Sequence, residues 1–207
     1  MFSGSYASSG LFVAFEGGEG AGKSTQASLL AEALSDREVV LTREPGGTPT
    51  GQRIREILLD PDTGDLDHRA EALLYAADKS EHLRAVIVPA LQRGAVVITD
   101  RYVDSTLAYQ GAGRDLDVND LEWIVRWATN DLRPHLTVLL DVTPSEGLGR
   151  FEERDRIEAE GQDFHMRVRN GFLSLAARDP EHYLVLDARQ PREELAATIL
   201  ERVKALL

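Results

Sequence analysis

The chain has 207 residues, 43% hydrophobic and 28% charged, which suits one α/β domain and excludes a disordered chain. Acidic residues outnumber basic residues 35 to 23, and the net charge of −12 argues against a general nucleic-acid binder. The absence of cysteine excludes disulfides and thiolate zinc sites, and no apolar run approaches the roughly 20 residues of a membrane span.

Short apolar segments that favour strands alternate along the chain with segments of helical spacing. Residues 1–10 lack a basic n-region and a long apolar run, so we expect a flexible tail on a cytoplasmic protein and no signal peptide. The predicted strands are, in chain order, residues 11–15, 39–42, 95–99, 136–142 and 183–187. The predicted helices are residues 24–34, 50–59, 70–93 (bent near Pro89), 116–129, 164–178 and 193–207, and residues 144–160 begin as a helix.

This alternation predicts βαβ units, and therefore an α/β fold in which helices cover both faces of a five-stranded parallel sheet. Residues 17–24, GGEGAGKS, follow a predicted strand, precede a predicted helix and fit the P-loop pattern G-x-x-x-x-G-K-S. Such glycines let backbone N–H groups surround phosphate oxygens, while Lys23 reaches the β- and γ-phosphates and the Ser24 hydroxyl meets Mg²⁺. The alternative, a glycine-rich turn without a ligand, is disfavoured because both spacing and context are met.

Two acidic residues end predicted strands near the P-loop. Asp100, followed by Arg101, ends the third strand, where open α/β sheets bind their ligands. An acid at this point commonly serves the metal in P-loop proteins, and a structural Asp100–Arg101 ion pair is the alternative. Glu16 ends the first strand and has two interpretations, a cap of the following turn or a member of the Mg²⁺ water shell.

A P-loop is shared by GTPases, ATP-driven motors and small-molecule kinases, so it does not identify the phosphate acceptor. The chain has no N-K-x-D motif for guanine and no further motor machinery. Its small size, its acidic charge and a late cluster of arginines favour a kinase that acts on a small acceptor.

Four segments together resemble the bacterial thymidylate kinases. They are FEGGEGAGKST (15–25), TREPGGTP (42–49) with Arg53 and Arg55 just beyond, DRYVDSTLAYQG (100–111) and DRIE (155–158) followed by Asp163-Phe164. The resemblance covers about residues 11–207 and implies a P-loop NTPase fold of the nucleoside-monophosphate-kinase type. It also implies Mg²⁺-dependent transfer of the ATP γ-phosphate to dTMP, and a homodimer. A P-loop kinase for another nucleotide or deoxynucleoside, and a non-catalytic nucleotide-binding module, remain as alternatives.

The resemblance implies roles for individual residues around the donor. The candidates for Mg²⁺ remain those that the P-loop and the strand ends indicate, Ser24, Asp100 and Glu16, and the resemblance makes Arg101 a bridge between the donor and acceptor phosphates. It assigns ATP to the whole P-loop, that is, to Gly17, Gly18, Glu19, Gly20, Ala21, Gly22, Lys23, Ser24 and Thr25.

The acceptor dTMP is assigned in the same way. Glu19 contacts the sugar 3′-hydroxyl, Arg55 clamps the phosphate and Arg43 lies nearby. Tyr75 stacks on thymine, and Lys79, at a position that is usually Arg in the family, contacts a base carbonyl. The remaining contacts are polar groups at the base edge and a ring that occupies the space of a ribose 2′-hydroxyl, namely Ser105, Gln110 and Thr106 for the edge and Tyr109 for the ring.

No variable P-loop position is basic, so the P-loop itself cannot supply an arginine to the transferring phosphoryl group. The resemblance places a lid at about residues 147–162, where family members of this kind carry that cation. Arg156 is the first candidate, Arg150 the second and Arg154 the third. The alternative is a solvated helix with ion pairs four residues apart.

Overall fold

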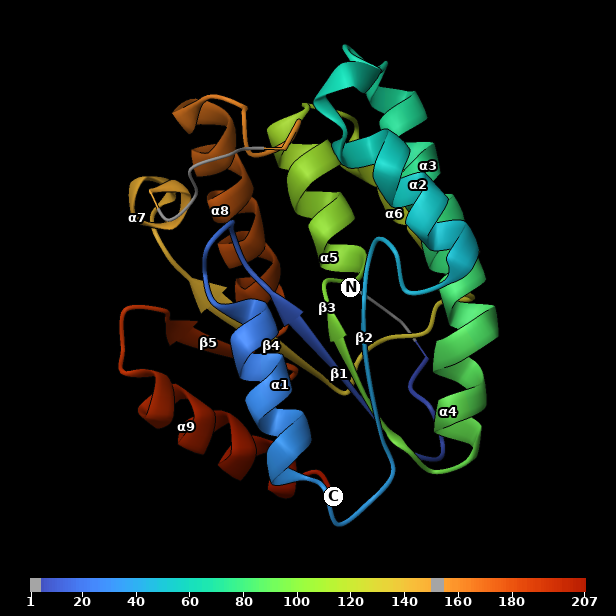
Figure 1. The fold of residues 1–207 in the computed structure, drawn as a ribbon, viewed down its shortest axis with the longest axis vertical. Coiled ribbons are helices and arrows are strands. Elements are labelled where there is room, and N and C mark those ends of the chain that lie inside the picture. Colours follow the sequence, from blue (N-terminus) through green and yellow to red (C-terminus); the bar gives the residue numbers. More distant parts are fainter. Residues whose placement is uncertain (1–4, 150–154) are drawn as a thin grey trace.

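The structure, a computed structural model, describes residues 5–149 and 155–207 and is built around a parallel five-stranded sheet (Figure 1). The strand order is β2-β3-β1-β4-β5. The strands are β1 (Leu11–Glu16), β2 (Val39–Arg43), β3 (Val96–Asp100), β4 (Leu136–Asp141) and β5 (Tyr183–Asp187). Each lies within one residue of its predicted bounds, so the predicted α/β fold is confirmed. Because all strands are parallel, their C-terminal ends lie at one edge of the sheet.

The helices of the described residues follow the predicted order, with two differences. They are α1 (Lys23–Ala33), α2 (Pro49–Leu59), α3 (His68–His82), α4 (Val88–Gln92), α5 (Val103–Thr106), α6 (Val118–Ala128), α7 (Pro144–Leu148), α8 (Gln162–Arg178) and α9 (Arg192–Lys204). A 3₁₀ turn, η1 (Pro61–Thr63), and two π-helical segments, η2 (Leu83–Ile87) and η3 (Leu107–Gly113), complete the list. None of these helices is long and apolar enough to cross a membrane.

The helix predicted over residues 70–93 is interrupted, because η2 separates α3 from α4. Pro89 lies at the start of α4. Proline has no backbone N–H, so it cannot donate a hydrogen bond to the preceding turn. The continuous helical stretch of α5 and η3 was not predicted at all. Nearly all of it is buried, so its sequence has no polar face and no helical periodicity of hydrophobic residues.

Alternate residues of the strands face two different hydrophobic cores. Leu11, Val13 and Phe15 of β1 pack against α1 and α9, which cover one face of the sheet (Figure 1). Phe12 and Ala14 point the other way, into a core shared with α3, α4, α5 and α6. Burial of β1 on both faces fixes the position of the loop that follows it.

Residues 5–10, which precede β1, contact three other parts of the fold. Ser5 pairs with Leu132 in a short β-bridge, the Tyr6 ring stacks on His182 with centroids 4.8 Å apart, and the Ser9 hydroxyl donates to the carbonyl of Leu91 at 3.0 Å. Residues 5–10 therefore contact the folded domain, while the flexibility expected of the tail stays a prediction. Residues 1–4 lie outside the described residues.

Candidate active site

The loop between β1 and α1 is seated tightly on the end of β4 and on α7. Gly20 has a φ of 66°, and a Cβ atom there would lie 2.2 Å from the carbonyl oxygen of Gly147. A Cβ atom on Gly17, where φ is 136°, would lie 2.3 Å from the carbonyl oxygen of Leu140. Both positions therefore require glycine, since any side chain would push the loop away from its support.

Three polar side chains are fixed at the start of α1 and the end of β3. The Lys23 ammonium donates to the carbonyl oxygens of Gly17 and Gly18 at 3.0 and 2.8 Å. The Ser24 hydroxyl donates to Asp100 Oδ2 at 2.5 Å. Burial and the nearby Arg101 lower the pKa of Lys23. The first turn of α1 thus presents a cation and a hydroxyl beside a carboxylate, as phosphate and metal binding require.

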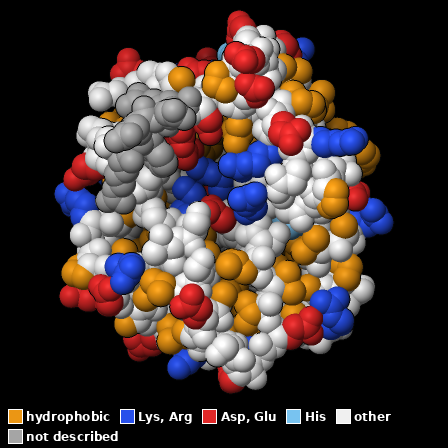
Figure 2. Space-filling view, viewed as in Figure 1, with side chains coloured by type: hydrophobic (Ala, Val, Ile, Leu, Met, Phe, Trp, Pro, Cys, Tyr) orange, Lys and Arg blue, Asp and Glu red, His pale blue; other side chains and the backbone are white. Residues whose placement is uncertain are grey.

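A cavity of about 940 Å³, here named the P-loop cavity, opens above the first turn of α1. Lys23, Arg43, Arg55 and Arg101 are its basic lining residues, and Figure 2 shows basic side chains gathered in the central hollow of this face. Although the chain as a whole is acidic, this hollow is suited to a polyanion. The remaining lining residues are Glu19, Gly20, Ala21, Gly22, Ser24, Thr25, Glu44 and Asp100.

A second cavity of about 530 Å³, the inner cavity, adjoins the first. The two share Glu19, Arg55 and Arg101 in their linings, so they meet at a group of charged side chains. Farther in, the lining becomes mixed aromatic and polar, as in a pocket for a small polar ring compound. These further residues are Pro45, Leu59, Tyr75, Ser105, Thr106, Tyr109, Gln110, Asp155, Ile157 and Glu158.

Arg101 stands at the junction of the two cavities. Its backbone φ of 72° is rare for a residue with a side chain, and such strain is concentrated at functional sites. The guanidinium donates to the Gly17 carbonyl at 3.2 Å, to Ser105 Oγ at 3.1 Å and to Glu19 Oε1 at 2.6 Å. Arg101 thus pairs with Glu19, whereas the alternative interpretation had paired it with Asp100.

Glu19 is held ionised at this junction. Its Oε1 also accepts a hydrogen bond from the Tyr109 hydroxyl at 2.7 Å. Burial opposes ionisation, but Arg101 and Lys23 outweigh it and lower the pKa of Glu19 to about 2. Glu19 therefore presents a hydrogen-bond acceptor between the cavities at any physiological pH.

Comparison with known proteins agrees with this arrangement. The family model for thymidylate kinase matches residues 15–199. The thymidylate kinase of Cutibacterium acnes is 54% identical over 200 residues, covering 96% of this chain and 98% of that protein. This chain belongs to the thymidylate kinase family.

Two further comparisons support the assignment to the thymidylate kinase family. The thymidylate kinase of Clavibacter michiganensis is 52% identical over 204 residues, covering 96% of each chain. The crystal structure of a thymidylate kinase from Ehrlichia chaffeensis superposes with a TM-score of 0.80 at 32% identity, covering 95% of this chain and 99% of that chain. The resemblance inferred from the four sequence segments is therefore confirmed at the level of family and fold.

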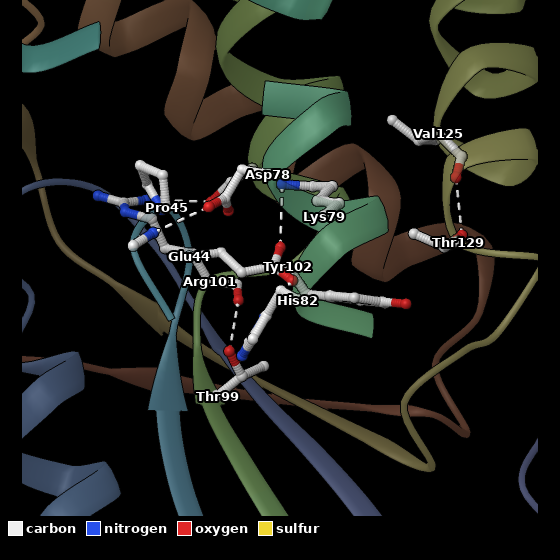
Figure 3. Close-up of polar contacts among 12 residues, drawn as sticks. Glu44, Pro45, Asp78, Lys79, His82, Thr99, Arg101, Tyr102, Val125 and Thr129 are labelled. Atoms are coloured by element: carbon white, nitrogen blue, oxygen red, sulfur yellow. Dashed lines mark hydrogen bonds and ion pairs between the residues drawn. The ribbon is translucent and has the colours of Figure 1, made fainter. Parts of the chain in front are cut away.

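The base contact predicted for Lys79 from the thymidylate kinase resemblance stays a prediction, and the structure shows a different partner for this side chain. The Lys79 ammonium is buried and lies 3.1 Å from Glu44 Oε2. Figure 3 shows both side chains, and Lys79 lines neither cavity. His82 Nδ1 bonds the other oxygen of Glu44 at 2.8 Å. Lys79 therefore supports the loop after β2, because an unpaired charge would be costly at this depth.

The role of Arg156 as the lid cation stays a prediction, and in this structure its side chain is paired with other elements. Its guanidinium pairs with Glu71 on α3, and its Nε donates to the carbonyl of Leu58 at 2.8 Å. These partners hold Arg156 next to the lining residues Asp155 and Ile157 of the inner cavity. The other candidates, Arg150 and Arg154, lie outside the described residues.

Glu16 is neither a cap of its own turn nor a lining residue of the P-loop cavity. Its carboxylate accepts from the backbone N–H of Tyr102 at 2.8 Å, and from Ser105 N–H at 3.1 Å and Oγ at 2.6 Å. It thus caps the start of α5. Burial, with a contribution from Asp104, raises its pKa to about 7. The Ser105 hydroxyl donates to Glu16 and accepts from Arg101, so its hydrogen is not available to a nucleotide base.

Several lining residues of the inner cavity were given no role from the sequence. Asp155, Ile157 and Glu158 belong to the DRIE segment, in which only Arg156 had been singled out. Pro45 and Leu59 also line the cavity. Glu71 was also given no role, although it does not line the cavity itself. Its sequence position could have indicated a place near the site, because it lies four residues before Tyr75 and therefore on the same helix face.

Proposed function

We propose that this chain transfers the γ-phosphoryl group of ATP to dTMP, giving ADP and dTDP. ATP would occupy the P-loop cavity and dTMP the inner cavity, so that the two phosphate ends meet at Arg101. An oxygen of the dTMP phosphate forms a bond to the γ-phosphorus, while the bond from that phosphorus to the ADP oxygen breaks. The observation that carries the proposal is the set of charged residues that both cavities share.

A coupled assay of ADP release across deoxynucleosides and nucleoside monophosphates tests the acceptor. We expect acceptor-dependent release with dTMP at a kcat/KM well above that of every other acceptor. Highest activity with a deoxynucleoside would favour a different P-loop kinase. ATP binding without release for any acceptor would favour a nucleotide-binding module.

Mg²⁺ fits the donor site proposed here. Ser24 Oγ and Asp100 Oδ2 offer oxygen ligands at the edge of the P-loop cavity, and Mg²⁺ typically takes few protein ligands while it keeps waters and nucleotide phosphates. Accordingly, the described residues hold no group of three or more His, Cys, Asp or Glu suited to a metal. When bound, the ion would neutralise charge on the β- and γ-phosphates. Glu16 is left out of this metal site.

Each end of dTMP has a matching group in the inner cavity. Arg55, held by the Pro45 carbonyl at 3.1 Å, and Arg101 suit the phosphate, because a guanidinium can donate two parallel hydrogen bonds to its oxygens. Glu19, ionised, would accept from the sugar 3′-hydroxyl, and the ring of Tyr109 would exclude a 2′-hydroxyl. Thr106 has a buried Oγ1 with no partner among the described residues, and it lines the cavity where the base edge would lie.

Tyr75 provides the stacking surface for the base in this proposal. Replacing it with alanine should weaken dTMP binding about tenfold or more and leave ATP binding unchanged, because base–aromatic stacking is worth roughly 1–3 kcal/mol. Tyr75→Phe, which keeps the ring, is the matched control and should bind dTMP nearly as the parent does. Titration of each nucleotide measures both. Equal losses for ATP and dTMP in Tyr75→Ala would instead indicate damage to the fold.

We also propose that the chain forms a homodimer through α3 and α6. Trp123 and Trp127 of α6 are 66% and 73% exposed, and their rings stack on each other at 6.5 Å. Leu73 of α3, 56% exposed, lines the same apolar groove, which has a volume of about 890 Å³. Large aromatic side chains exposed together are typical of protein interfaces and rare on monomers. A second copy of the chain can cover this surface symmetrically.

Light scattering after size-exclusion chromatography tests the homodimer. The parent should have twice the mass of one chain, and the variant Trp123→Glu/Trp127→Glu should have the mass of one chain, because two charges would be buried at the interface. Leu207→Glu, at an exposed apolar residue that does not line this groove, is the control and should stay dimeric. A parent that is monomeric at micromolar concentration would contradict the proposal.

A further inference from the structure

Glu71 of α3 lies fully buried behind the wall of the inner cavity and joins three separate elements. Its Oε1 accepts from Gln110 Nε2 at 2.8 Å and from Arg114 Nε at 3.2 Å. Its Oε2 accepts from Arg114 Nη2 at 3.2 Å and pairs with Arg156. Gln110 belongs to η3, Arg114 follows η3, and Arg156 belongs to the DRIE segment. One carboxylate thus fixes a neutral amide and two guanidinium groups.

The two arginines keep the Glu71 carboxylate ionised. Burial raises the pKa of Glu71, but the hydrogen bonds from Arg114, Gln110 and Arg156 lower it by more, so the pKa falls below its ordinary value. Arg114 is itself held over the Phe164 ring at 4.9 Å and paired with Glu160. An ionised carboxylate can only accept hydrogen bonds.

It follows that only the NH₂ end of the Gln110 amide can face Glu71. The amide oxygen Oε1 must then point away from Glu71, and Gln110 is a lining residue of the inner cavity. Within the described part of the chain, the Gln110 side chain has a hydrogen bond to Glu71 and to no other group. Gln110 therefore offers its amide oxygen to the cavity as an acceptor, while its NH₂ group is held on the side of Glu71.

We propose that Glu71 is a positioning residue that determines base selectivity, because it fixes the Gln110 amide with its oxygen toward the acceptor base. The inference rests on the proposed placement of dTMP in the inner cavity. An oxygen there matches the N3–H donor of thymine and opposes the N3 lone pair of cytosine. A site built to pair with one hydrogen-bonding pattern rejects a base that leaves its buried polar group unpaired.

The ratio of kcat/KM for dTMP to that for dCMP tests this role, measured in the parent and in Glu71→Gln. Glutamine has nearly the same shape, but its own NH₂ can donate to Gln110 Oε1, so the Gln110 amide is free to turn over. We expect the dTMP:dCMP ratio to fall about tenfold or more, which corresponds to one misplaced hydrogen bond, with the KM for ATP unchanged. Glu160→Gln is the matched control, because it removes a partner of Arg114 without touching Glu71, and its ratio should stay at the parent value.

A further variant separates this inference from the proposed function. If Glu71→Gln keeps the parent ratio while Gln110→Leu lowers it, Glu71 does not set selectivity and the placement of the base stands. If Gln110→Leu also keeps the ratio and the dTMP affinity of the parent, the base does not lie beside Gln110 and the placement fails.

A second variant, which lacks Glu71 and both of its arginine partners, serves if Glu71→Gln does not fold. If thermal melting shows that Glu71→Gln is unfolded, the same ratio is measured in Glu71→Met/Arg114→Met/Arg156→Met. Replacing buried ion partners together with apolar residues is commonly tolerated, and the remaining partner, Glu160, is partly exposed to solvent. Loss of the cavity wall alone would weaken dTMP and dCMP alike and leave the ratio unchanged. A parent-like ratio in this variant would overturn the inference, and a reduced ratio would support it.

Discussion

Replacing Lys23 with alanine should abolish acceptor-dependent ADP release while the protein stays folded. The Lys23 ammonium donates to the carbonyls of Gly17 and Gly18 and lines the P-loop cavity. Lys23 belongs to none of the hydrophobic core clusters, so the fold should tolerate its loss. Negative charge on the transferring phosphoryl group would lose its fixed partner, and a preorganised cation of this kind is among the largest contributions to such a reaction. Initial rates at saturating ATP and dTMP, beside a thermal melting curve, measure both parts of the prediction.

Lys204→Ala provides the matched control for Lys23→Ala. Lys204 is an exposed lysine in the last turn of α9, far along the chain from the P-loop. Its replacement should leave the rate unchanged, because a solvated surface charge is worth little. If Lys23→Ala retained most of the parental rate, the assignment of the P-loop cavity to ATP would be wrong.

Replacing Arg101 with alanine should reduce kcat by about 10³-fold or more, as removal of an arginine from the transition state does in other P-loop enzymes. Arg101 touches Gly17 of the P-loop and Glu19 at the entrance of the inner cavity, so both phosphate ends would lose the same cation. Arg101→Lys should recover only part of the rate, since an ammonium lacks the planar fork. Arg93→Ala is the control, because Arg93 is an exposed arginine paired with Glu38.

The pH dependence of the Arg101→Ala variant adds a second measurement. Arg101 is the leading influence that lowers the pKa of Glu19 to about 2, and burial would raise that pKa once Arg101 is removed. The parent should keep an ionised Glu19 down to strongly acidic pH, and the variant should lose dTMP affinity at a higher pH. If the two pH profiles of dTMP affinity coincided, Arg101 would not be what keeps Glu19 ionised.

The sequence was sufficient to predict the features that depend on local pattern. The strands were predictable because a buried parallel strand is a short continuous apolar run, as in residues 95–99. The P-loop was predictable because its glycines, Lys23 and Ser24 occur at fixed spacing between a strand and a helix. In the structure Gly17 and Gly20 do pack against β4 and α7.

Partners that are distant in sequence could not be predicted. Lys79 and Arg156 carry charges that suit a substrate, but each is paired with a buried carboxylate on another element, Glu44 for Lys79 and Glu71 for Arg156. A resemblance to a family indicates where a residue lies in the fold, but it does not indicate which carboxylate the side chain pairs with. The Lys79 side chain was therefore expected at the base. The α5–η3 stretch was missed because burial on all sides removes the helical period.

Competition by a bisubstrate compound is the most direct test that the two cavities form one phosphoryl-transfer site. The compound is adenosine joined to thymidine through five phosphates, one more than ATP and dTMP carry together. We predict that it competes with both ATP and dTMP and binds much more tightly than either. One molecule fills both cavities, so the translational and rotational freedom of only one ligand is lost on binding. Competition with ATP alone, at an affinity no better than that of ATP, would contradict the account.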